Sequence, residues 1–229
     1  MDITLILFSF LGGLGLFLYG IKAMSDGLQS AAGDRLRLIL ERGTSSPIRG
    51  VLTGTLVTSL IQSSSGTTVI AVGLVNAGLL NLRQAIGIIM GANIGTTVTA
   101  YLIGFNLKDY ALPIIAIGVL LLFFSKNKKI NYIGQVIFGF GLLFYGMEVM
   151  GRGMQPLRSS EFFINLMTNV DNNSLFGVLI GAMFTGIVQS SSATIGILQE
   201  LVYQGAVTLK QAVPMLFGMN VGTTATALL

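Results

Sequence analysis

Histidine and cysteine are both missing from this 229-residue chain, and only 10% of its residues are charged. Without histidine the chain lacks the usual general base and the commonest metal ligand. Without cysteine it has neither thiolate nucleophiles nor disulfides. A soluble domain carries about 25% charged residues, so the shortage of charge argues against one. We therefore expect neither an enzyme nor a soluble protein.

What fills the chain instead is apolar: 52% of the residues are hydrophobic and the mean hydropathy is +0.80. A membrane helix needs about 20 apolar residues. Four stretches approach that length, and we expect each to cross a bilayer: 3 to 22, 84 to 104, 110 to 125 and 131 to 149. The net charge of +4 is too small to predict nucleic-acid binding, and we interpret it as a topology signal. The fold class expected is an all-α membrane protein.

One polar run occurs twice in these apolar surroundings. Gln62-Ser63-Ser64-Ser65 returns 127 residues later as Gln189-Ser190-Ser191-Ser192. At the same offset, 50–70 matches 177–197 at eleven of 21 positions, and 82–97 matches 209–224 at eight of 16. Two long blocks in one register predict an internal duplication. We place the first repeat at 1–125 and the second at 131–229, which stops before any counterpart of 110–125 and is C-terminally incomplete.

The polar run divides an apolar stretch into two short arms. Residues 50–61 and 69–80 are each about 12 residues, or about 18 Å, long, whereas a bilayer core is about 30 Å thick. This pattern favours a re-entrant hairpin at about 50–80, with a counterpart at about 177–207. Irregular backbone at that depth must line protein or a water-filled cavity. The alternative is one long helix with a hydroxyl-rich middle.

Charged residues beside these spans predict the topology. Stretches 26–45 and 152–170 mix charged and apolar residues, which is typical of a helix lying at the membrane interface. With hairpins and an outside N-terminus, nine of the 13 Lys and Arg residues are cytoplasmic, against eight without hairpins. Each repeat then has three crossings, and an odd number inverts the second repeat. The two hairpin tips would then approach each other from opposite sides.

Both hairpin tips offer ligands of the same kinds. A helix start presents free N–H groups, which suit an anion, and a helix end presents carbonyls, which suit a small cation. Serine hydroxyls and glutamine amides serve either. The repeated Gly-x-Asn-x-Gly-Thr-Thr segments suggest an additional break in the next helix, although simple packing through small residues is the alternative. The candidate substrate and ion ligands are Gln62, Ser63, Ser64, Ser65, Thr67, Asn93, Thr96, Thr97, Gln189, Ser190, Ser191, Ser192, Thr194, Asn220, Thr223 and Thr224.

The paired Gln-Ser-Ser-Ser and Gly-x-Asn-x-Gly-Thr-Thr motifs resemble those of the type II sodium–phosphate cotransporter family, in its bacterial form. The resemblance implies sodium-driven transport of inorganic phosphate by alternating access between inverted repeats, in the inner (plasma) membrane. Expected sodium ligands are Gln62, Ser64, Gln189 and Ser191. No cofactor is expected beyond sodium as co-substrate. Partners implied are phosphate, sodium and the lipid bilayer, with a homodimer or a separate cytoplasmic regulatory domain left open.

Two rival functions remain at this stage. Facing half-helices also build channel filters, and a membrane phosphate sensor would bind without transport. A serine hydrolase fits poorly because no histidine, and no nearby Lys or Asp, could activate Ser64 or Ser191. Outside the tips, we expect Glu200 to be solvated at the outer end of its hairpin. For Lys22 and Glu148, which are equivalent at an offset of 126, we expect snorkelling rather than pairing.

Overall fold

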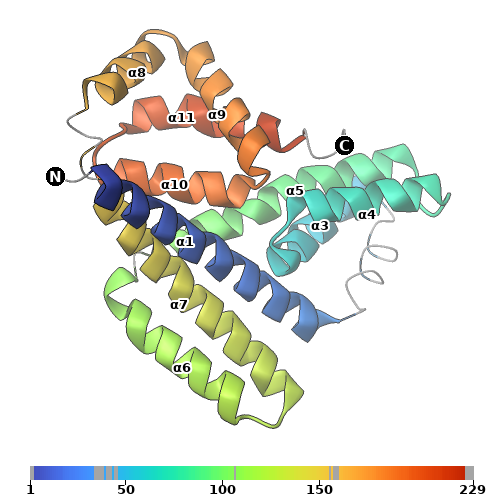
Figure 1. Cartoon of the computed structure of the whole chain (residues 1–229). Coiled ribbons are helices and arrows are strands. Elements are labelled where there is room, and N and C mark those ends of the chain that lie inside the picture. The colour runs from blue at the N-terminus through green and yellow to red at the C-terminus, as the bar shows by residue number, and fades with distance from the viewer. Residues whose placement is uncertain are drawn as a thin grey trace. The chain divides into compact units, whose positions relative to one another are not determined.

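The computed structural model describes residues 3–33, 39, 43, 46–105, 107–154, 156 and 160–224. Within these residues the chain is helical throughout, as expected, with ten α-helices and no strand (Figure 1). The elements are α1 (Ile3–Ala32), α3 (Pro47–Ile61), α4 (Ser64–Asn76), α5 (Leu82–Ile103), the 3₁₀ turn η1 (Lys108–Tyr110), α6 (Ala111–Phe124), α7 (Lys128–Met154), α8 (Glu161–Asn172), α9 (Ser174–Val188), α10 (Ser191–Tyr203) and α11 (Leu209–Thr223).

The chain divides into two compact units. Unit 1 contains Met1–Ile21, Asn106–Ile115 and Phe140–Leu229, and unit 2 contains Lys22–Phe105 and Ala116–Gly139. Helices α3, α4 and α5 belong to unit 2, whereas α8 to α11 belong to unit 1. Helices α1, α6 and α7 each contribute residues to both units. The two Gln-Ser-Ser-Ser runs therefore lie in different units.

Three described helices are long and apolar enough to cross a membrane: Leu7–Ala32 in α1, α5, and α7. They overlap three of the four predicted spans: 3–22, 84–104 and 131–149. The fourth, 110–125, forms α6, which has only 14 residues. At 1.5 Å per residue α6 is about 21 Å long, shorter than a bilayer core of about 30 Å. Helix α6 alone is therefore too short for the full crossing that was predicted for this segment.

The prediction of a separate interfacial helix beginning at residue 26 is wrong. Helix α1 continues without interruption through Asp26 and Gly27 to Ala32. Gly33 has φ +60° and donates its N–H to the Gln29 carbonyl, which is the usual glycine end of a helix. Arg35, Arg37 and Arg42 lie outside the described residues. In the second repeat, 152–154 complete α7 and α8 follows as a helix of its own, with Met167 and Val170 buried.

Helices α3 and α5 pack against each other through glycines, and α9 and α11 do so through glycines at the equivalent positions. A Cβ at Gly91 would lie 2.0 Å from the Val51 carbonyl oxygen, and one at Gly218 would lie 1.9 Å from that of Val178. No real Cβ tolerates such distances, so only glycine permits these helices to approach so closely. Both contacts are related by the 127-residue offset.

These contacts correct the expected additional break. Helix α5 runs unbroken from Leu82 to Ile103, through Gly91, Asn93 and Gly95, and α11 runs through Gly218 and Gly222 to Thr223. Matching capping boxes start both helices, at Asn81 with Gln84 and at Thr208 with Gln211. The glycines of Gly-x-Asn-x-Gly-Thr-Thr therefore serve helix packing, which was the alternative interpretation.

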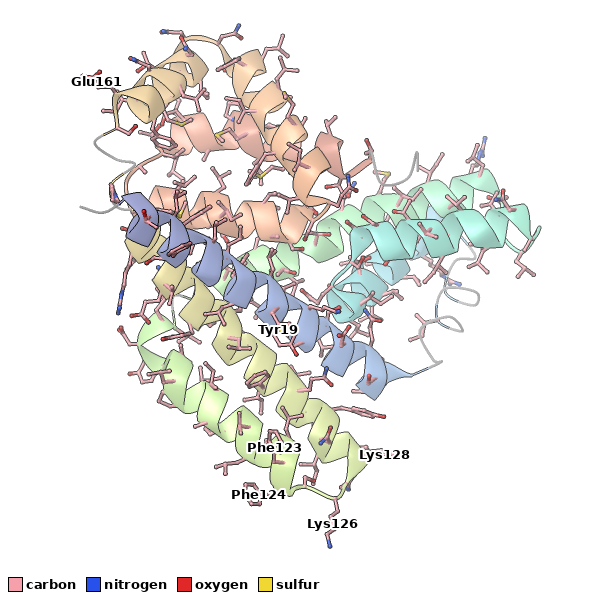
Figure 2. All side chains as sticks on the ribbon, in the orientation of Figure 1. Tyr19, Phe123, Phe124, Lys126, Lys128 and Glu161 are labelled. Atoms are coloured by element: carbon pink, nitrogen blue, oxygen red, sulfur yellow. The ribbon has the colours of Figure 1, made fainter. Side chains whose placement is uncertain are left out.

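The turn between α6 and α7 is basic and aromatic. Phe123 and Phe124 lie at the end of α6, each 80% exposed, and Lys126 and Lys128 follow at the turn (Figure 2). Aromatic and basic residues in this arrangement are typical of the boundary between lipid and water. The turn therefore provides a marker for one end of these helices.

Candidate functional site

The helix stops at the first Gln-Ser-Ser-Ser run and restarts two residues later. Gln62 caps α3 in the left-handed conformation, with φ 60° and ψ 24°, and donates its N–H to the Thr58 carbonyl at 2.7 Å. Ser63 is extended, with φ −142°, and α4 begins at Ser64. We call Gln62–Ser63 the first helix break. It excludes one continuous helix, and it is shorter than the segment 62–68 that separates the two predicted arms.

The second run folds in the same way within unit 1. Gln189 caps α9 with φ 58° and ψ 21°, Ser190 is extended with φ −145°, and α10 begins at Ser191. We call Gln189–Ser190 the second helix break. Gln62 and Gln189 are the only described residues other than glycine with positive φ. Glycine or asparagine usually occupies this cap position, and a glutamine there costs about 1–3 kcal/mol.

At the first break, the Gln62 side chain is held by α3 and α5. Its Nε2 donates to the Ser59 carbonyl at 2.5 Å, and its Oε1 accepts from the Thr99 hydroxyl. Gln62 is 8% exposed and Thr99 is fully buried. The sequence reasoning missed Thr99, although a signal existed: Thr226 occupies the equivalent place at offset 127, outside the described residues.

A pair of threonines joins the two helices at each break. The Thr58 and Thr67 hydroxyls lie 2.8 Å apart, and those of Thr185 and Thr194 lie 2.9 Å apart. All four side chains are fully buried. Thr67 and Thr194, predicted as ligands, thus hold the two arms of each break together. Thr58 and Thr185 were not among the predicted site residues.

The serines divide into a cap and a first turn. Ser63 Oγ accepts from the Gly66 amide at 3.0 Å, and Ser190 Oγ accepts from the Ala193 amide at 3.3 Å. The next two serines of each run, Ser64-Ser65 and Ser191-Ser192, open α4 and α10. Amides in the first helical turn have no intrahelical partner and point out of the helix start. This arrangement can accept an anion.

One expected cation ligand is already occupied. The last carbonyl of α3, at Ile61, accepts from the Ser25 hydroxyl at 2.5 Å and from the Gln29 amide at 3.2 Å, both donated by α1. In the second repeat the equivalent of Ser25, at offset 126, is Gly151, which has no hydroxyl. The two breaks therefore differ in how their helix ends are covered.

The structure does not bring the Gly-x-Asn-x-Gly-Thr-Thr polar groups to the breaks. Asn93, Thr97, Asn220 and Thr224 are exposed, while Thr96 is buried and Thr223 partly buried. The hydroxyls of all four threonines bond carbonyls of their own helices: Ala92 for Thr96, Ile94 for Thr97, Met219 for Thr223 and Val221 for Thr224. In the described part of the chain, neither asparagine is hydrogen-bonded to a Gln-Ser-Ser-Ser residue.

The expectation that Glu200 is solvated is wrong. Its side chain has no exposed surface, and it forms an ion pair with Lys108 Nζ at 2.7 Å. The partner is 92 residues away and was invisible to pattern reasoning. Glu148 pairs with Arg152, one turn along α7. No group of three or more acidic side chains that could hold a metal occurs among the described residues.

Comparison with known proteins gives a consistent picture. The family model described as Na+/Pi-cotransporter matches residues 16–152 and 142–229. YqeW of Bacillus subtilis is 32% identical over 225 residues, covering 98% of this chain and 73% of that protein. The Escherichia coli K12 protein named "Putative inorganic phosphate export protein YjbB" is 28% identical, covering 98% of this chain and 41% of that protein.

A mammalian relative matches a shorter region. Sodium-dependent phosphate transport protein 2A of Rattus norvegicus is 45% identical over 91 residues, covering 39% of this chain and 14% of that protein. The chain thus spans less than half the length of YjbB and of this mammalian relative. No solved structure matches significantly. On the family match, which extends over most of its length, the chain belongs to the Na+/Pi-cotransporter family, a family of transporters and not of enzymes.

Proposed function

We propose that this chain carries inorganic phosphate across a membrane together with sodium, by alternating access. The observation that carries the proposal is the pair of equivalent helix breaks, each with a left-handed glutamine followed by serines that open a helix. Strained backbone at a polar position is typical of a functional site. The family and the names of YjbB and protein 2A support phosphate as the substrate.

In this proposal the two breaks are tips of re-entrant hairpins, in repeats 1–125 and 131–229 of opposite membrane topology. The first turns of α4 and α10 supply amides and the hydroxyls of Ser64, Ser65, Ser191 and Ser192 to phosphate. Ser64, Ser191 and Ser192 are 5–7% exposed, so an anion there would be largely desolvated. Charge-assisted bonds from such donors are about twice as strong as neutral ones.

Sodium would bind to neutral oxygens at the same tips. The carboxamide oxygens of Gln62 and Gln189 are proposed ligands together with the Ser64 and Ser191 hydroxyls. An amide oxygen has two lone pairs, so Gln62 Oε1 can accept from Thr99 and still face a cation. Neutral oxygens suit sodium better than a proton relay, which normally uses Asp, Glu or His. Each break would thus offer ligands for both ions.

The direction of transport follows from the gradients. YjbB is named for phosphate export, whereas protein 2A is named for sodium-dependent phosphate transport. An alternating-access carrier is reversible, so the sodium and phosphate gradients decide which way net flux runs. We place the protein in the bacterial inner membrane, and propose that any homodimer partner or regulatory domain acts on this same carrier.

Reconstitution into proteoliposomes tests the function. Radiolabelled phosphate should accumulate above equilibrium when an inward sodium gradient is imposed, and the initial rate should saturate with phosphate. Choline in place of sodium should abolish accumulation, and sulfate as the tracer serves as the control for anion selectivity. Saturable phosphate binding without flux would favour a sensor. Flux that does not saturate would favour a channel. Accumulation at full rate in choline, driven by a pH gradient, would refute sodium coupling.

A further inference from the structure

Unit 1 contains a buried ion pair that the proposed transport chemistry does not use. Both oxygens of the Glu200 carboxylate accept from Lys108 Nζ, at 2.9 and 2.7 Å, and Oε1 also accepts from Gln204 Nε2 at 2.9 Å. Glu200 has no exposed surface, and the Lys108 side chain is only 13% exposed. The ammonium also lies over the Tyr203 ring, 4.3 Å from its centroid.

This pair ties together three segments of unit 1. Lys108 begins η1, the short turn that precedes α6, while Glu200, Tyr203 and Gln204 lie on α10 or at its end. Helix α7 contributes Gly151, where a Cβ would lie 2.2 Å from Glu200 Oε1. The absence of a side chain at Gly151 is therefore what makes room for the carboxylate.

The pair joins a first-repeat residue, Lys108, to a second-repeat residue, Glu200, and the duplication does not reproduce it. The first-repeat residue equivalent to Glu200 is Gly73, and the equivalent of Gly151 is Ser25, whose hydroxyl instead bonds the Ile61 carbonyl. A buried ion pair adds little net stability compared with apolar residues, because desolvation offsets the attraction. Its presence is thus better explained by a role in choosing between conformations than by stability.

On this basis, and on the proposed alternating-access function, we propose that Lys108 and Glu200 are positioning residues that favour one end state of the transport cycle. Inverted repeats change access by exchanging conformations, so a contact that has no counterpart at the equivalent positions biases the exchange. The pair fixes α10, whose first turn begins at the second helix break, against η1 and α7. Breaking the pair shifts the populations of the two end states. Apparent substrate affinity changes with it, because it is proportional to the fraction of protein in the binding-competent state.

A thiol reporter tests the proposal independently of transport. The chain has no native cysteine, so Val188→Cys, half-buried beside the second break, can be labelled alone by an impermeant thiol reagent. The decisive variant is Lys108→Met/Glu200→Gln. It removes both charges together, so no unpaired charge is left buried. We expect it to fold with the parent's melting temperature while the labelling rate changes at least fivefold. Apparent KM for phosphate should change with it.

The exposed ion pair between Lys210 and Asp171 provides the matched control. Its atoms are 3.4 Å apart and the side chains are 77% and 36% exposed. Lys210→Met/Asp171→Asn should leave the labelling rate within twofold of the parent. The parent rate in the folded Lys108/Glu200 double variant, or failure of that variant to fold, would overturn the proposal in favour of a purely structural pair. Absence of phosphate transport by the parent would reject the proposed function and leave the labelling result standing.

Discussion

Two glutamines occupy backbone positions that usually belong to glycine. Gln62 and Gln189 both cap a helix at positive φ, and no other described residue except glycine does so. Gln62 is buried and bonded to Thr99, whereas the Gln189 side chain is exposed and its amide bonds the Gly186 carbonyl. The strain is thus the same at both positions, but the packing around the side chain differs.

Because the Gln189 side chain is exposed, a substitution there tests the backbone strain separately from side-chain packing. Glycine adopts positive φ without steric penalty, so Gln189→Gly should relieve about 1 kcal/mol of strain and raise the melting temperature of the detergent-solubilised protein. Phosphate-dependent stabilisation should decrease at the same time, since the amide is lost. Gln189→Ala, which keeps the strain, is the control. A Gln189→Gly variant that melts below Gln189→Ala would contradict the strain argument.

The serines that open α4 and α10 should contribute jointly to phosphate binding. Removing one hydroxyl from a buried site costs about 1–3 kcal/mol, so Ser64→Ala and Ser191→Ala should each weaken binding roughly 5- to 150-fold. The double variant should depart from additivity if both residues share one ligand. Titration calorimetry on the wild type, both single variants and the double variant measures this. If one substitution abolishes binding and the other has no effect, only one tip carries the substrate.

At the scale of elements, glycine determines how closely helices approach. A Cβ at Gly91 would meet the Val51 carbonyl, whereas at Gly73, in α4, no neighbouring atom lies within 4 Å. Overpacking a helix interface costs about 1–3 kcal/mol, while alanine is otherwise favoured over glycine in a helix by about 1 kcal/mol. A Gly→Ala substitution should therefore destabilise the protein at position 91 and should not destabilise it at position 73.

The experiment compares melting temperatures of Gly91→Ala and Gly73→Ala. Gly91→Ala should lower the melting temperature by several degrees and reduce the yield of folded protein, because α3 and α5 must separate. Gly73→Ala should leave it unchanged or slightly higher. Equal melting temperatures for the two variants would show that α3 and α5 are not packed as described.

The same elements show how far sequence reasoning extends. Polar residues between short apolar arms, repeated at a fixed offset, correctly located both helix breaks. The prediction of a helix break at the Gly-x-Asn-x-Gly-Thr-Thr segments was wrong. A glycine that breaks a helix and a glycine that permits close packing of another helix cannot be distinguished from the sequence of one segment. The Lys108–Glu200 pair could not be predicted, since its partners are 92 residues apart and no local pattern joins them.

For the whole molecule, the arrangement across the membrane is the main prediction. The proposed inverted-repeat topology predicts that Lys128, in the turn after α6, lies on the same side as position 37 and on the opposite side from Lys210. Single cysteines at these positions, in a chain without native cysteine, should react with an impermeant reagent accordingly. Cysteines at 128 and 37 should label only in inverted vesicles and one at 210 only in intact cells. Labelling at 128 from the same side as 210 would contradict inversion.

The threonine pairs have a consequence for motion. Each helix break could act as a hinge if its two arms were free to move. Buried hydrogen bonds between threonine hydroxyls join the arms, however: Thr58 with Thr67 at the first break and Thr185 with Thr194 at the second. Bending at the break would separate the paired hydroxyls and take from the buried Thr58 and Thr185 hydroxyls the partners that they have on the other arm. Each pair of arms should therefore move as one rigid lever, and the conformational changes of this protein should pivot in the connections beyond the arms.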